Sequence, residues 1–242
     1  MSRLPNAPLL EVIFELRWEL TINDINDFQY LHGDLYSRLK DKYPFRENLV
    51  PPGIPPEIVK GKPIYRFRSK PGGYPLLQVG PGLISINTID EKYYWVEFSK
   101  EIETILDGLD SIYPKYKTLK LQPSLIYIDF LAYNKQDMTP QEFMNNNLHL
   151  NFKQDFIADG DAKLKEVNIS LNYQVGTDIV SLNIADGQSN NDTGLILQTK
   201  IMGRDDNYSS GDLLKWLGIA HELSSTLFKS LTKGQLYESF KS

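Results

Sequence analysis

The segment Gln78–Phe98, QVGPGLISINTIDEKYYWVEF, decides the predicted fold because it combines strand, turn, strand and helix signals in one run. The Gly80-Pro81-Gly82 turn separates two apolar stretches, Pro75–Val79 and Leu83–Asn87, which is typical of antiparallel strands. A glycine-rich turn that cradles phosphate usually leads directly into a helix. Because a strand follows here, the turn predicts a hairpin and not a nucleotide site.

The residues on either side complete a first α+β unit. Leu10–Leu20 alternates apolar and polar residues, which predicts a strand with one buried face. Apolar residues at helical spacing follow from Ile25 to Leu39, and the proline-rich segment Val50–Pro63 predicts an extended connection. A second helix is predicted from about Glu91 to Tyr113-Pro114.

A second and longer unit repeats this order. Leu119–Tyr133 predicts a strand in which Pro123 indicates a bulge or an edge position. Thr139 and Ser209 each begin a helix with a capping box, and the second of these helices extends to Leu231. Three strands are predicted between the helices, with a polar loop at 186–193, namely Val167–Tyr173, Ile179–Ala185 and Leu195–Met202.

The two units together predict an α+β fold with a mainly antiparallel sheet covered by helices and a long C-terminal helix across it. The repeated order predicts two similar halves, residues 1–114 and 115–242, packed intimately as one globular unit. The sequences of the halves are not similar enough to establish duplication. A helix lying across a sheet can enclose a cavity or expose a saddle, and the fold by itself does not choose between them.

Composition and charge exclude several classes of function. The chain has no cysteine, which excludes disulfides, thiolate nucleophiles and cysteine-ligated zinc. Charged residues interrupt the first 20 positions, and no stretch approaches the length of a bilayer span. These features predict a soluble cytoplasmic protein with no membrane partner. A net charge of −5 disfavours nucleic acid, for which Arg66 and Arg68 on one strand face are the nearest candidates.

Several short motifs resemble a sporadically distributed prokaryotic protein family of similar length. They are Ala7-Pro8-Leu9-x-Glu11-Val12-x-Phe14-Glu15, Gln78–Pro81 with Ile84-x-Ile86-Asn87, Tyr94-x-x-x-Phe98, and Ala220-His221 followed by Phe228 and Leu231-Thr232. The resemblance covers nearly the whole chain. No activity is established for that family, so the resemblance implies no catalytic residue. The patchy distribution of the family resembles that of accessory genes, including those of phage-defence islands.

Two ionisable residues are candidate site residues. His221 neighbours Glu222 on the last helix, but adjacent helical side chains diverge by about 100°, so the two do not form an acid–base pair. No histidine spacing indicates a helical metal site, and a packing role for His221 is the simpler interpretation. Asp129 interrupts the apolar run Leu125–Leu131, where its carboxylate is either buried and perturbed or exposed on the other face.

The aromatic run before the second helix supplies two further candidates. Tyr93, Tyr94 and Trp95 are consecutive, and the side chains of consecutive helix positions diverge, so the three cannot all enter the core. At least one tyrosine is therefore expected to be exposed or to cover the adjoining loop. Exposed tyrosine is favoured at recognition surfaces, although an amphipathic tyrosine at the rim of a core is commoner.

These observations lead to three hypotheses about function. The first is a non-enzymatic protein-interaction module. One form of this hypothesis makes the protein a homodimer, and another gives it a defence-associated accessory role. The second is a small-molecule binder or enzyme with a cavity under the last helix, which a sealed helix–sheet interface would exclude. The third is a nucleic-acid accessory protein. No catalytic residue, metal ligand or cofactor is predicted.

Overall fold

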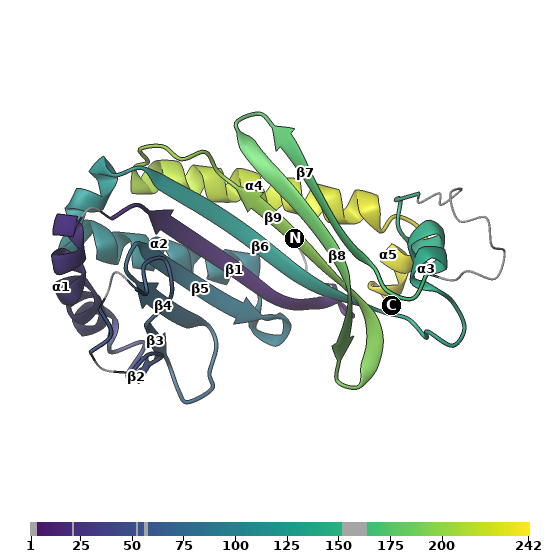
Figure 1. Cartoon of the computed structure of the whole chain (residues 1–242), viewed down its shortest axis with the longest axis horizontal. Coiled ribbons are helices and arrows are strands. Elements are labelled where there is room, and N and C mark those ends of the chain that lie inside the picture. Colours follow the sequence, from purple (N-terminus) through teal and green to yellow (C-terminus); the bar gives the residue numbers. More distant parts are fainter. Residues whose placement is uncertain (1–3, 21, 52, 56–57, 152–163) are drawn as a thin grey trace.

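The computed structural model describes residues 4–20, 22–51, 53–55, 58–151 and 164–242. Over these residues the strands form one nine-stranded antiparallel sheet in the order β2-β3-β4-β5-β1-β6-β9-β8-β7, which confirms the predicted α+β class (Figure 1). The strands are β1 (Leu9–Trp18), β2 (Phe45–Asn48), β3 (Tyr65–Arg68), β4 (Leu76–Gly80), β5 (Leu83–Ile89), β6 (Leu121–Ala132), β7 (Asn168–Val175), β8 (Asp178–Ser189) and β9 (Asp192–Met202).

The main helices cover one face of this sheet. In Figure 1 the strands face the viewer, and the helices α2 and α4 lie behind them. The helices are α1 (Ile22–Leu39), α2 (Trp95–Ile112), α3 (Pro140–Asn147), α4 (Ser210–Leu231) and α5 (Gln235–Ser239), with short 3-10 turns η1 (Asp90–Lys92) and η2 (Pro114–Thr118). Both predicted capping boxes form, at Thr139 for α3 and at Ser209 for the long C-terminal helix α4.

The two halves of the chain have the same strand arrangement. In the first half β1 pairs with β5, which continues through β4 to β3, and in the second β6 pairs with β9, which continues through β8 to β7. The first strands of the two halves, β1 and β6, pair antiparallel with each other in the middle of the sheet. The halves therefore share one continuous sheet, and the division into units 1–114 and 115–242 stays a prediction.

Alternation along the central strands separates the two faces of the sheet. On β1, Val12, Phe14, Leu16 and Trp18 are buried in the main core, which extends from α1 through α2 to α4. Because Val12 is in register with Tyr127 of β6, Tyr127 lies on this same helix-covered face. The twofold period therefore already determines which residues of β6 can meet α4.

The structure corrects two local predictions. The predicted loop at 186–193 is mostly strand, because β8 and β9 continue to a tight turn at Asn190 and Asn191 with φ of 50° and 74°. Asparagine tolerates this left-handed conformation, which two-residue hairpin turns require. Pro123 lies in a central strand and not at an edge. The pairing beside it is irregular, because β9 pairs with β6 only from Ser124 onward and the bridge between Leu121 and Asp206 is out of that register by one residue.

Candidate functional site

A cavity of about 1080 Å³ lies between the helix-covered face of the sheet and the helices α2 and α4. Its floor comes from β6 and β9, and its walls come from the start of α2, the second half of α4, residues before β1 and the C-terminal segment. Most of its lining is apolar and includes Leu9, Trp95, Val96 and Phe228. The helix–sheet interface is therefore not sealed.

A chain of hydrogen bonds joins three elements across the cavity. The hydroxyl of Tyr93 lies 2.8 Å from the hydroxyl of Tyr127, which in turn lies 2.8 Å from Nδ1 of His221. The indole of Trp95 stacks on the imidazole of His221, with ring centroids 3.7 Å apart and planes inclined by 7°. The loop before α2, the strand β6 and the helix α4 are thus connected through side chains that line the cavity.

All three members of this chain are neutral near pH 7. Burial raises the pKa of Tyr93 and of Tyr127 above the ordinary range, and the nearby carboxylate of Asp129 raises both further. Burial lowers the pKa of His221 to about 4. The chain therefore offers uncharged donors and acceptors to whatever occupies the cavity.

Two more polar residues lie on the floor. Thr199 of β9 is in register with Tyr127 and is only 1% exposed, and its Oγ1 has no hydrogen-bond partner in the described part of the chain. Asp129 follows Tyr127 by two residues on β6 and is 5% exposed. Both side chains line the cavity, so polar groups gather at its inner end.

At the start of α4, in the second half, the side chains contact one another directly. There the start of α4 meets the end of α2, and Ser210 donates to Asp110 over 2.8 Å and lies 2.7 Å from the hydroxyl of Tyr116. Tyr116 is fully buried and also donates to Asp110. The similar strand arrangement of the halves is thus not matched by similar packing, and the cavity belongs to the start of α2.

Comparisons with protein-family models, curated proteins and solved structures found no match. The resemblance described above stays a hypothesis, and the site is interpreted from its own chemistry.

The structure brings four of the six predicted candidates together. Tyr93, Tyr94, Asp129 and His221 all line the cavity. Tyr94 is 50% exposed, as expected for one member of an aromatic run that cannot be buried as a whole.

Arg66 and Arg68 lie elsewhere, on β3. Their guanidinium groups are 3.6 and 3.3 Å from the carboxylate of Glu47 on β2. Arg68 is also buried and donates to the carbonyl of Gly73 over 2.7 Å. Both arginines are therefore paired with the same carboxylate, away from the cavity.

The residues that sequence reasoning missed are Tyr127, Thr199 and Trp95. One signal was available, because Tyr127 and Asp129 are two positions apart in a predicted strand and must share a face. Thr199 had no such signal, since a threonine inside a strand is ordinary. Its significance depends on the absence of a partner, which only the packing reveals.

The described residues offer neither a metal cluster nor a membrane-spanning helix. Over the described residues, no group of three histidine, cysteine or acidic side chains is placed to hold a metal ion. In the same part of the chain, no helix has the length and apolar character to cross a bilayer.

Proposed function

We propose that the protein binds a small, largely apolar molecule in the cavity between the sheet and α4. The observation that carries this proposal is the cavity itself, about 1080 Å³ in volume, with an apolar lining and a few convergent polar groups. Ligand sites in proteins are typically concave, of roughly 300–1,000 Å³, and mostly apolar with a small number of placed polar groups. The cavity is slightly larger than that range.

The packing of the rest of the protein supports this interpretation. Protein interiors are close-packed, and voids larger than a water molecule are few. Here Leu35, Phe67 and Leu109 of the main core are fully buried. The cavity lies beside this core and opens to the surface at exposed residues such as Tyr94 and Val96, so it is a concave site that a ligand can enter and not a void inside the core.

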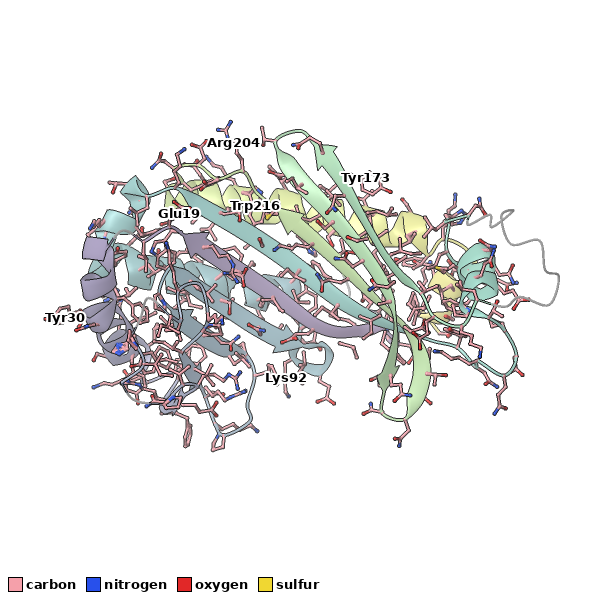
Figure 2. The ribbon with its side chains drawn as sticks, in the orientation of Figure 1. Glu19, Tyr30, Lys92, Tyr173, Arg204 and Trp216 are labelled. Carbon is pink, nitrogen blue, oxygen red and sulfur yellow. The ribbon has the colours of Figure 1, made fainter. Side chains whose placement is uncertain are left out.

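The exposed aromatic side chains give less support to a protein-binding surface. Tyr30 on α1 and Tyr173 on β7 are 72% and 49% exposed, but they lie on distant parts of the molecule (Figure 2). Scattered exposed apolar residues are normal on protein surfaces, whereas interaction sites gather them into a patch. Among the three hypotheses the small-molecule binder is thus the best supported. A protein partner, a homodimer, a nucleic-acid role and a defence-associated role stay predictions from the sequence.

Titration with N-phenyl-1-naphthylamine, a neutral fluorophore that brightens in apolar surroundings, tests the proposal. We expect saturable binding with one molecule per chain. Ser224→Phe should abolish it, because Ser224 is 3% exposed and lines the cavity. Ser230→Phe on the exposed side of the same helix is the matched control and should bind as the unaltered protein does.

Circular dichroism establishes that both variants are folded. No saturable fluorescence from the unaltered protein would overturn the proposal, and so would equal binding by the folded Ser224→Phe variant.

A further inference from the structure

We infer that the ligand carries a neutral oxygen, a carbonyl or a hydroxyl, which binds to Thr199 and to the Tyr93–Tyr127–His221 chain at the inner end of the cavity. This inference rests on the proposed function and specifies the class of ligand: an apolar, uncharged molecule with an oxygen at the end that enters first.

Thr199 indicates where such an oxygen would bind. Its hydroxyl is buried, lines the cavity and has no hydrogen-bond partner among the described residues. Buried polar groups in native proteins are nearly always paired, and an unpaired one costs free energy. A ligand oxygen at this position would satisfy the hydroxyl, which can both donate and accept.

The protons of the chain leave it one unused donor. Two neutral phenols and one neutral imidazole carry one N–H or O–H proton each, and the two hydrogen bonds of the chain use two of the three. If Tyr127 donates to His221 Nδ1, the proton left over is on Nε2 of that ring. If His221 donates instead, the proton left over is on the hydroxyl of Tyr93 or on that of Tyr127. In every arrangement the chain keeps one unused donor and at least one unused acceptor.

No partner satisfies Nε2 of His221 in the described part of the chain. The chain can therefore donate to a carbonyl oxygen or accept from a hydroxyl, and reversing its direction exchanges the two ends. This property suits a neutral oxygen of either kind.

The charges around Tyr127 disfavour an anion at the inner end of the cavity. The charged groups that act on the Tyr127 hydroxyl are the carboxylates of Asp129 and Glu222. Lys229 acts on His221 at the other end of the chain, and it and the other described lining cations, Lys100 and Lys241, are exposed or half-buried. A carboxylate or phosphate beside Tyr127 would thus meet like charge, whereas a neutral oxygen would not.

A pair of fluorescent probes separates this inference from the proposed function. 6-Propionyl-2-(dimethylamino)naphthalene is a neutral ketone whose emission shifts to the red when its carbonyl accepts a hydrogen bond, and N-phenyl-1-naphthylamine has no oxygen. Thr199→Val and Tyr127→Phe each remove one hydroxyl with little change in shape. We expect each variant to weaken ketone binding by about 3- to 10-fold, the value of one neutral hydrogen bond. The emission of the bound ketone should also shift to the blue.

The amine should bind both variants within about twofold of the unaltered protein, because it has no oxygen to accept a hydrogen bond and its diarylamine N–H is a weak donor. Thr88→Val is the matched control. The hydroxyl of Thr88 is likewise buried without a partner, but Thr88 does not line the cavity. This control should leave both probes unaffected.

Three outcomes would overturn the inference. Unchanged ketone affinity and emission in Thr199→Val would do so while leaving the proposed function intact through the amine. An equal loss of both probes would show that the variant acts through the shape of the cavity. Failure of both probes with the unaltered protein would overturn the proposed function and this inference together. Thr199→Val, the nearly isosteric change, decides the result if Tyr127→Phe does not fold.

Discussion

Replacing His221 by Asn should make the protein less sensitive to mild acid. His221 is 9% exposed and stacked on Trp95, and burial lowers its pKa from 6.5 to about 4. In the unfolded chain the pKa returns to 6.5, so between pH 6.5 and 4 the unfolded state binds more protons than the folded state. The free energy of unfolding must therefore fall as the pH falls through this window. The contribution of the neutral His221 to stability is complete above pH 6.5.

The size of the effect follows from the shift. One group that protonates only in the unfolded state changes the free energy of unfolding by at most about 1.4 kcal/mol per pH unit. For the pKa values above, the loss due to His221 reaches about 2.5 kcal/mol at pH 4.5 relative to pH 7.5. His32 has a pKa lowered to about 4 as well, chiefly by burial, but it titrates in both proteins and its contribution cancels.

Urea denaturation from pH 4.5 to 7.5, followed by circular dichroism, measures the difference. Asparagine can place an amide near the position of Nδ1 and so keep a partner for Tyr127, but it does not titrate. The stability of the unaltered protein relative to His221→Asn should fall by about 2.5 kcal/mol on acidification to pH 4.5. Parallel stability curves would refute the reasoning. A relative gain on acidification would mean that a carboxylate such as Glu222 holds the imidazole in its charged form.

Five other substitutions test the packing and the local structure by urea denaturation. Thr199→Val and Thr88→Val should each raise the free energy of unfolding by about 1 kcal/mol, because each removes a buried hydroxyl without a partner; a loss in either would indicate that the hydroxyl is paired. Gly82→Ala should lower the free energy of unfolding by more than about 2 kcal/mol, because φ there is +74° and the added Cβ would lie 2.5 Å from a backbone oxygen. Gly218→Ala in α4 has open space around it and should raise the free energy of unfolding by about 0.5–1 kcal/mol. Ser209→Ala should cost about 1 kcal/mol by removing the capping box of α4, and an unchanged midpoint would show that the cap is not needed.

Much of the fold could be predicted because its signals are local. Alternation along β1 identified the buried face, and the capping boxes at Thr139 and Ser209 placed the starts of α3 and α4. These signals arise from side-chain direction and from backbone groups within a few residues, so a single sequence contains them. The turn at Asn190 and Asn191 was missed for the opposite reason: its polar residues resemble those of a long loop, and only the ladder between β8 and β9 distinguishes the two.

The sequence by itself determined the antiparallel α+β class, the long final helix and the aromatic run before α2. Only the tertiary structure decided that Tyr93, Tyr127 and His221 form one chain, since Tyr127 is 34 positions from the first and 94 from the last. The physical reason is that periodicity reports which face of an element is covered. Whether the space above that face is filled depends on side chains from α2, α4 and two strands meeting at once. Around Tyr116, which is fully buried, those side chains contact one another directly, and around Tyr127 they leave a cavity.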